Sequence, residues 1–389
     1  MRLSDWSLST IVAGFVAVLV GFASSVAIVF QAAAAAGASP ELTASWVGVL
    51  GFAMGISCIG FSWYYKAPIL TAWSTPGAAL LATSLQGISL AEAVGVFMFS
   101  AVLTTALGLS GWFDKLTRSI PLPIAAAMLA GIMLKFGLDI FVSMQTSPVL
   151  VLAMVVVFFL AKRWMPRYAV PIVLLAGVLF CLRWQSLDFN RVELEFVQLV
   201  WVAPDWSWSA MLGVGIPLFV VTMTSQNIPG LAVLRASGYQ TPVSPLLSWT
   251  GLITLCSAPF GNFSINLAAI TAAICSGSEA HPDPTKRYTA GIAAGVFYLL
   301  TGLAGATVVA LFTVFPKELI ATVAGLALLG TIAANLATAT VDSKHRDAAI
   351  LTLLVTASGV SFYGIASAFW GLVAGLMTTG WLSWRRSQG

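Results

Sequence analysis

The chain has 389 residues, of which 59% are apolar and only 8% are charged, with a mean hydropathy of +0.95 and a formal net charge of +4. Because a soluble domain carries about 25% charged residues, this composition excludes a soluble enzyme and a nucleic-acid-binding protein. The apolar runs are long and unbroken, whereas outer-membrane strands alternate over about ten residues. The sequence therefore indicates an all-α polytopic membrane protein.

Fourteen apolar segments can be placed as membrane spans joined by short polar connections. They lie near 10–35, 43–63, 67–85, 90–111, 121–140, 147–162, 168–182, 209–235, 244–258, 259–276, 288–313, 318–338, 347–360 and 362–384. With the N-terminus in the cytoplasm, most basic residues fall in cytoplasmic loops, including the pairs at 162–163, 286–287 and 385–386. These pairs are interpreted as topology determinants, so both termini are expected to be cytoplasmic.

The two halves of the chain share a weak internal repeat. Small residues recur in the same order at Gly14, Ser24, Gly37 and 45–48, and again at Gly215, Ser225, Gly238 and 248–251. Since each half has seven spans, an odd number, the second half must be inverted in the membrane. We expect inverted repeats at 1–185 and 209–389, joined by an outer loop at 186–208. This organisation is typical of secondary transporters, which bind substrate near the membrane midplane.

Span three contains a segment that is a poor continuous helix. Pro76 has no N–H and disfavours helix at the preceding Thr75. The sequence therefore predicts extended backbone at 68–74 and a short helix that begins at Pro76, with Thr75 as its N-cap. Such extended backbone is tolerated in a bilayer only where protein or a cavity satisfies its polar groups.

Span ten carries a corresponding break. Pairing Pro68 with Pro259 also pairs Thr75 with Asn266, which predicts a second half-helix with Asn266 as its N-cap. Two inverted half-helices would point their positive N-termini at each other near the midplane, which makes an anion site without a buried lysine or arginine. The alternative is that proline and glycine only kink packed helices.

Polar residues within other spans are further candidates. Gln226 and Asn227 in span eight are costly in hydrocarbon unless paired, so they either line a substrate site or bond between helices. Asp139 and Glu92 are candidates for proton coupling. Their alternatives are an ion pair between Asp139 and Lys135, and a favourable interaction of Glu92 with the dipole of its own helix.

Enzymatic and metal chemistry find little support in the sequence. The cysteines are scattered through apolar segments, and both histidines lie in polar loops. Without a nucleophile–base pair or clustered ligands at membrane depth, we expect no catalytic residue, no metal site and no cofactor other than a proton as coupling ion.

Several of these segments resemble one known family. The stretches at 71–80, 221–227, 269–275, 279–283, 346–349 and 367–372 resemble the BenE family of bacterial benzoate/proton symporters. The resemblance covers essentially the whole chain, and it implies proton-coupled uptake of benzoate or a related aromatic carboxylate across the bacterial inner membrane. More distantly, the layout resembles the nucleobase–cation symporters. That resemblance implies core and gate domains, short extended breaks in spans 3 and 10, and leaves a homodimer open.

One departure from the nucleobase carriers bears on the substrate. The position of their half-helix glutamate is matched here by Ile265, beside Asn266, and no acid occurs at Gln226 or Asn227. A buried carboxylate would repel an anion, so these residues favour an anionic substrate. Another organic anion or a nucleobase-like solute remains the alternative.

The combined hypothesis places the substrate carboxylate near Thr75 and Asn266, with an aromatic ring beside it. The expected substrate-binding residues are Trp73, Ser74, Thr75, Met223, Gln226, Asn227, Asn262, Phe263, Ser264 and Asn266. Among these, Trp73, Met223 and Phe263 are expected to contact the ring. The expected partners are this substrate and membrane lipid, with no nucleic acid. The proton either travels on the substrate itself or on a protein acid.

Overall fold

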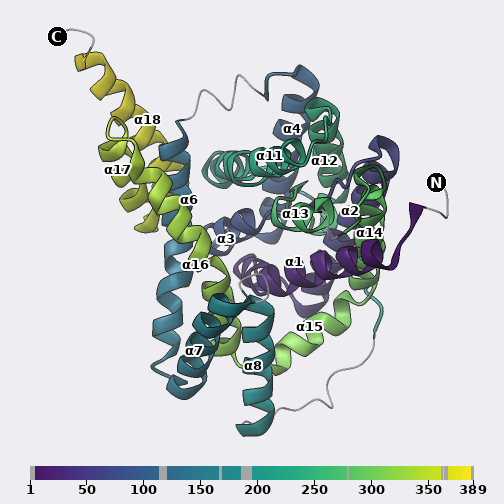
Figure 1. Ribbon diagram of the computed structural model, residues 1–389. Coiled ribbons are helices and arrows are strands. Elements are labelled where there is room, and N and C mark those ends of the chain that lie inside the picture. The colour runs from purple at the N-terminus through teal and green to yellow at the C-terminus, as the bar shows by residue number, and fades with distance from the viewer. Residues whose placement is uncertain are drawn as a thin grey trace.

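The computed structural model describes residues 5–113, 121–165, 169–184, 195–277, 280–360, 362 and 367–386. Most of them are helical (Figure 1). The first half contains α1 (Leu8–Ala35), α2 (Pro40–Tyr65), α3 (Thr75–Ser84), α4 (Leu90–Ser110), α6 (Leu122–Ser143), α7 (Pro148–Trp164) and α8 (Ala169–Trp184). The second half contains α9 (Trp208–Ala210), α10 (Ile216–Thr222), α11 (Ile228–Ala236), α12 (Val243–Ser257), α13 (Ile270–Ser276), α14 (Tyr288–Leu303), α15 (Gly305–Val314), α16 (Lys317–Val341), α17 (Arg346–Ala357) and α18 (Ser367–Arg386).

The helices confirm a polytopic membrane protein of the all-α class. Within the described residues, six helices are long and apolar enough to cross a membrane, and a seventh span results if the bent pair Leu8–Phe22 and Ser25–Ala35 is counted as one. Several of the fourteen expected spans form shorter helices instead. The clearest cases are α3 and α13, with 10 and 7 residues, because a full crossing needs about 20.

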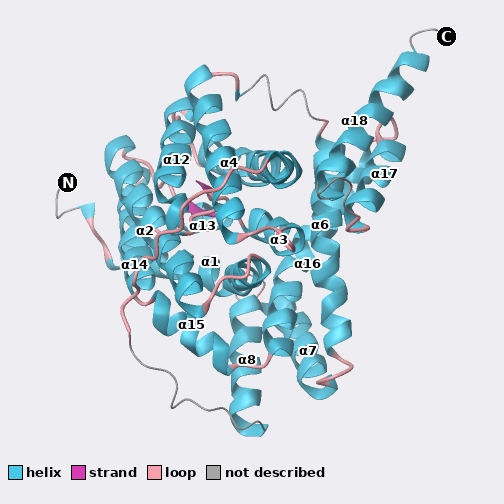
Figure 2. Cartoon of the chain, turned by 180° about the vertical axis from the view of Figure 1, so that it is seen from behind, coloured by secondary structure: helices cyan, strands magenta, loops and turns pink. Residues whose placement is uncertain are grey.

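Two short strands lie at the centre of the molecule, where Figure 2 shows them in magenta. The strand β1 (Thr71–Trp73) pairs antiparallel with β2 (Ile265–Leu267), so that Ala72 lies opposite Asn266. Backbone bonds from Ser74 to Ser264 and from Ala268 to Leu70 extend the pairing beyond both strands. The expected extended breaks are therefore present, and each satisfies the backbone polar groups of the other.

The two half-helices begin at different residues from those predicted. Ser74 is the N-cap of α3 and its Oγ accepts the Gly77 N–H at 3.0 Å, so Thr75 is the first helical residue and not the cap. The assignment of Asn266 as an N-cap is wrong, because Asn266 lies in the middle of β2. The antiparallel pairing keeps the chain extended through Ala268, and α13 therefore begins only at Ile270.

The helix that runs from α9 to α11 contains two π-helical turns, η4 (Met211–Gly215) and η5 (Met223–Asn227). Each turn is followed at its second residue by a proline, Pro217 or Pro229, which cannot donate to the helix. The Ile228 N–H bonds to the Met223 carbonyl, five residues earlier. Such turns insert an extra residue into a helix and often occur at functional sites.

Helices from the two halves pack against one another. The pairs in contact include α2 with α14, α4 with α12, and α6 with α16, while α7 packs on α8 and α17 on α18. In Figure 1, α6 and α16–α18 lie on one side of the molecule, and α2, α12 and α14 on the other. The sheet, α3 and α13 lie between these groups of helices.

The described part of the expected outer connection, 195–207, forms neither helix nor strand and is bonded to both halves. Val200 donates to Ser45 Oγ of α2 at 2.9 Å, Val202 to the Pro259 carbonyl at 2.8 Å, and Asp205 to the Ala91 carbonyl at 2.9 Å. Residues 185–194, which contain the rest of this connection, lie outside the described residues.

Candidate functional site

A cavity of about 580 Å³ lies where α3 and α13 begin. Its wall is formed by α1, β1, α3, the π turn η5, the segment from β2 to α13, and α14, and it is completed by α6, α16 and Pro171 of α8. This volume is in the range of sites that hold small organic ligands. All of the lining residues that the structure describes are uncharged.

One wall of the cavity is aromatic. The rings of Trp73 and Phe22 lie with their centroids 5.2 Å apart, and both residues line the cavity together with Tyr298 of α14. The Trp73 Nε1–H donates to Ser25 Oγ at 2.8 Å, and Ser25 donates in turn to the Gly21 carbonyl at 2.8 Å. This chain of bonds fixes the indole ring, which leaves its carbon surface available to an aromatic ligand.

The π turn η5 adds polar groups to the same cavity. Thr224, Ser225 and Gln226 are consecutive, and all three line it. Thr224 Oγ1 bonds back to the Val220 carbonyl at 2.8 Å. Among the described residues, the amide of Gln226 has no hydrogen-bond partner, so it is available to a ligand.

The first turns of both half-helices also reach the cavity, at Thr75 and Pro76 of α3 and at Ala269 and Thr271 beside or within α13. N–H groups in the first turn of a helix have no partner within that helix and carry partial positive charge. Thr271 is 5% exposed, and its Oγ1 has no hydrogen-bond partner. In α3, Pro76 has no N–H and the Gly77 N–H is bonded to Ser74 Oγ, so the neutral donors open to an anion are the Thr75 N–H, the first-turn N–H groups of α13 and the Thr271 hydroxyl.

A family model described as "Benzoate membrane transport protein" matches residues 4–380 of this chain. The chain belongs to this family. It is 47% identical to "Inner membrane protein YdcO" of Escherichia coli (strain K12), over 96% of each chain. It is 42% identical to "Benzoate membrane transport protein" of Acinetobacter baylyi (strain ATCC 33305 / BD413 / ADP1), over 96% of this chain and 95% of that one. The chain is thus a membrane transport protein and not an enzyme.

Solved structures share the fold of this benzoate transport family member at low sequence identity. The transmembrane domain of a cyanobacterium bicarbonate transporter, BicA, superposes with a TM-score of 0.65 at 15% identity, covering 94% of this chain and 96% of that one. The murine anion transporter Slc26a9 in the inward-facing state gives 0.61 at 13% identity, covering 99% of this chain and 70% of that one.

Three of the predicted substrate-binding residues, Trp73, Thr75 and Gln226, line the cavity of this family member together. Ser74 is close by but fully buried. Its Oγ accepts hydrogen bonds from Thr222 Oγ1 at 3.1 Å and from the Gly77 N–H. Ser74 therefore holds the start of α3 in place and does not line the cavity.

The other predicted residues surround the strands. Asn227 Oδ1 accepts the Leu267 N–H at 3.0 Å, and its Nδ2 lies 3.6 Å from the sulfur of Met223. Both side chains are buried outside the cavity lining, so they connect η5 to β2. Asn266 occupies β2 in the same buried layer.

The remaining three predicted residues, Asn262, Phe263 and Ser264, come directly before β2 in the chain. Asn262 donates to Ser257 Oγ at 2.7 Å, and Phe263 packs against the rings of Trp46 and Phe97. Ser264 accepts the Ser74 N–H through its carbonyl. None of these three lines the cavity in the part of the chain that is described.

The two candidate proton-coupling acids also lie away from the cavity lining. Glu92 forms a capping box with Ser89, whose N–H it accepts at 2.9 Å, as its position in the first turn of α4 favours. Asp139 of α6 is half-buried, and no ion pair with the described Lys135 is present, so the expected pairing is wrong. Their part in proton coupling stays a prediction.

Some cavity residues were not singled out from the sequence. Phe22 and Tyr298 belong to apolar spans, where an aromatic residue gives no local signal. Asn335 and Thr338 of α16 are polar residues within an apolar span, which is the same signal that Gln226 gives. Ser225 and Thr271 lie within stretches that resemble the family. The free N–H groups in the first turn of the half-helix were a signal for Thr271, and the helix break expected at Pro229 was a signal for Ser225. No group of three potential metal ligands is found among the described residues.

Proposed function

We propose that this protein is a proton-coupled carrier for benzoate or another small aromatic carboxylate, and that it works by alternating access. The observation that carries the proposal is the cavity itself. It places the aromatic surface of Trp73 and Phe22 beside the unpaired amide of Gln226, the Thr75 N–H of α3 and the first-turn N–H groups of α13. This combination matches a ligand with a flat apolar ring and one negative group.

The carboxylate would accept hydrogen bonds from the Thr75 N–H of α3 and from the first turn of α13. Neutral donors at helix N-termini bind anions, and Thr271 Oγ1 and Gln226 add unpaired side-chain donors there. The ring would lie against Trp73 and Phe22, with Tyr298 on a further side. Asp139 and Glu92 take no part in this binding.

Proton coupling follows from the electrical cost of moving an anion. An aromatic carboxylic acid is ionised at neutral pH, and a negative-inside potential opposes its entry by about 2.3 kcal/mol per charge per 100 mV. One accompanying proton removes this cost. Two carriers of that proton stay open, the substrate carboxyl group and a protein acid such as Asp139 or Glu92.

The alternative is a carrier for another organic anion or a nucleobase-like solute. The solved structures with this fold are those of a bicarbonate transporter and an anion transporter, which favours an anion over a neutral nucleobase. Competition for uptake by benzoate, by a non-aromatic carboxylate and by a purine would separate these substrates.

The proposed architecture is two inverted repeats of seven spans, 1–185 and 209–389. It is supported by the way contacts mirror each other between the halves. The contact of α2 with α14 is matched by α12 with α4, that of α7 with α8 by α17 with α18, and β1 pairs with β2. Inverted repeats also place broken helices at the midplane.

Within this architecture, α1–α4 and α9–α14 would form the core, and α6–α8 and α16–α18 the gate. The cavity has walls from both groups, so their relative movement would open it to either side of the membrane. The protein would lie in the bacterial inner membrane with both termini cytoplasmic. A homodimer through the gate is compatible with this arrangement.

The decisive experiment is benzoate uptake into proteoliposomes with an imposed inward proton gradient. We expect uptake above that of empty liposomes, loss of it with a protonophore, and a strong reduction in Gln226→Ala. Gln145→Ala, which removes the same side chain from an exposed position, should behave as wild type. Protein-dependent uptake that ignores the protonophore would refute proton coupling, and no uptake above empty liposomes would refute benzoate as substrate.

A further inference from the structure

The loop that follows α13 contains an arginine bonded to backbone on three sides. Arg287 donates from Nε to the His281 carbonyl at 2.7 Å, from Nη1 to the Ser276 carbonyl at 2.8 Å, and from Nη2 to the Pro282 carbonyl at 3.4 Å. All three acceptors are main-chain oxygens, so the guanidinium group ties the end of α13 to residues 281–282 before α14. A guanidinium is suited to this because its donors form a rigid planar fork.

The bond to Ser276 acts on the end of α13. This helix has only 7 residues, far fewer than a helix needs to be stable alone. Its last carbonyls have no partners within the helix, and they carry partial negative charge. Arg287 supplies both a donor and a positive charge at that end. The helix is also short, about 10 Å at 1.5 Å per residue, so the placement of Ser276 determines where its first turn lies.

That first turn carries cavity groups. Ala269 and Thr271 line the cavity at the opposite end of α13 from Arg287. Thr271 has a buried and unpartnered Oγ1, and a movement of α13 would change the position of this hydroxyl in the cavity wall. Arg287 itself does not line the cavity.

The same loop also holds the helix that bears η5. The Tyr239 hydroxyl, just beyond the end of α11, donates to the Pro284 carbonyl at 2.8 Å. The turn between these contacts is closed locally, since Asp283 donates its N–H to His281 Nδ1 at 3.0 Å and its carboxylate accepts the Thr285 N–H at 2.9 Å. One loop therefore fixes the far ends of both α11 and α13, which contact each other.

We propose that Arg287 is a positioning residue for substrate binding, which holds Thr271 and the open N–H groups of α13 at the cavity. The proposal rests on the proposed function of that cavity as the substrate site. It differs from the reading of residues 286–287 as topology determinants, for which the charge alone matters and either basic residue would serve.

Three variants separate the two readings. Arg287→Lys keeps the charge but loses the fork, Arg287→Ala loses both, and Lys286→Ala removes an equal charge one residue away, where no side-chain bond is found among the described residues. Each purified full-length variant is assayed for benzoate affinity in detergent. Without substrate, hydrogen–deuterium exchange of the peptide covering 265–277 is then compared, together with thermal stability.

We expect Arg287→Lys to weaken benzoate binding about tenfold, as the loss of charge-assisted hydrogen bonds predicts, and to speed exchange across α13. Lys286→Ala should change neither. Unchanged affinity and exchange in Arg287→Lys would overturn the proposal, and so would faster exchange with unchanged affinity. If wild type binds no benzoate, the proposed substrate is wrong, and the exchange comparison alone still decides whether Arg287 fixes α13.

Discussion

Asn227 Oδ1 accepts a hydrogen bond from the backbone N–H of Leu267 at 3.0 Å. This bond joins η5, whose neighbouring residues line the cavity, to β2, whose other edge pairs with β1. One edge of β2 is therefore paired with β1, from the first half of the chain, and the other edge is bonded to Asn227 of η5. Stability of the central breaks should depend on this one side chain.

We expect Asn227→Ala to lower the free energy of unfolding by about 1–3 kcal/mol, because the Leu267 N–H would be left buried without a partner. The measurement is a thermal unfolding curve of the purified protein in detergent. Gln145→Ala serves as the control, since Gln145 is exposed. A melting temperature equal to wild type for Asn227→Ala would show that water or another group replaces the bond.

Gly230 lies where α11 crosses β2. A Cβ at this position would lie 2.8 Å from the Leu267 carbonyl oxygen, which is too close for any side chain. We expect Gly230→Ala to push α11 from β2 and to reduce the yield of folded protein, measured by size-exclusion chromatography. Gly60→Ala is the matched control, because a Cβ there meets no atom within 4 Å, and alanine stabilises a helix by about 0.5–1 kcal/mol over glycine. Equal yields would contradict the close approach.

Trp73 can be tested with its ring retained. Trp73→Phe loses the hydrogen bond to Ser25 but keeps an aromatic surface, so we expect the KM for benzoate to rise about fivefold, equivalent to a net hydrogen bond of about 1 kcal/mol. Trp73→Ala should lose measurable uptake. The control is Trp249→Phe, at a side chain that is 54% exposed. A wild-type KM in Trp73→Ala would show that the Trp73 ring does not contact the substrate.

Gln226→Glu keeps the size of the side chain and adds a negative charge to an uncharged cavity. Since like charges repel strongly in surroundings of low polarity, we expect binding of benzoate at pH 7.5 to be lost, while the fold and melting temperature are kept. Isothermal titration calorimetry would measure this. Gln145→Glu introduces the same charge at an exposed site and should bind as wild type. Retained affinity in Gln226→Glu would place the carboxylate elsewhere.

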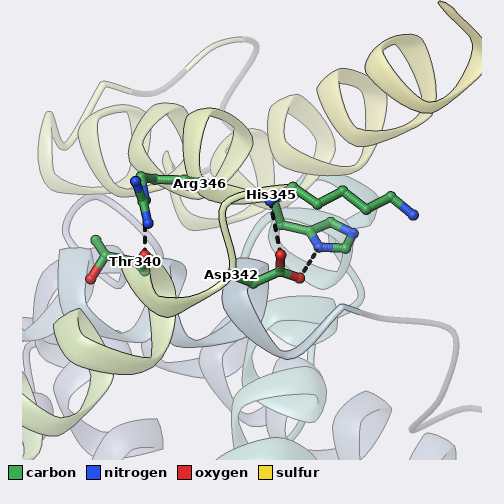
Figure 3. A network of polar contacts seen from close by, with 5 residues as sticks. Thr340, Asp342, His345 and Arg346 are labelled. Carbon is green, nitrogen blue, oxygen red and sulfur yellow. Dashed lines mark hydrogen bonds and ion pairs between the residues drawn. The ribbon is translucent and has the colours of Figure 1, made fainter. Parts of the chain in front are cut away.

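The loop between α16 and α17 offers a test of pH dependence (Figure 3). The hydrogen bond from His345 Nδ1, at 2.6 Å, and the Lys344 N–H hold the pKa of the Asp342 carboxyl below its ordinary value. A depressed pKa gives stability that is present above the unfolded value, near 3.9, and that is lost as the pH falls through the folded value. We expect Asp342→Asn to lower the melting temperature slightly at pH 7.

That difference should shrink below about pH 4, where the wild-type carboxylate also becomes protonated. The measurement is a series of melting curves for both proteins from pH 7 to the acid limit of the detergent-solubilised protein. Asp347→Asn, at the start of α17, is the control for loss of a nearby acid. A difference that is constant with pH would show that Asp342 contributes through its shape and not its charge.

The break at residues 68–76 could be predicted from the sequence in all but one detail, the identity of the helix cap. Pro76 lacks an N–H and restricts the backbone at its own position and at Thr75 in any surroundings. The break and the short helix after it could therefore be predicted to within one residue. The cap is Ser74 and not Thr75, and Thr222 donates to the same Ser74 Oγ from another helix. No local pattern contains that contact.

The error at Asn266 has a similar cause. Asparagine is a good N-cap by type, but β1 keeps it in a strand, and that pairing is a tertiary constraint. The turn at Ala258–Phe260 and the left-handed Gly261 also add residues before β2, so pairing the two halves by their prolines lost register there. The roles of Asn262, Phe263 and Ser264 likewise depend on neighbours that no local pattern contains, from α12, from α2 and α4, and from the N-cap of α3 respectively.

The pairing of β1 with β2 has a consequence for the order of synthesis. When a ribosome has completed β1 and α3, the strand that satisfies their open backbone has not yet been made, because it belongs to the other half of the chain. Until β2 arrives, the Thr71–Trp73 segment must be shielded by the insertion machinery or wait at the membrane surface. The first half should therefore mature late, and a nascent chain arrested before Ile265 should remain sensitive to proteases that the finished protein resists.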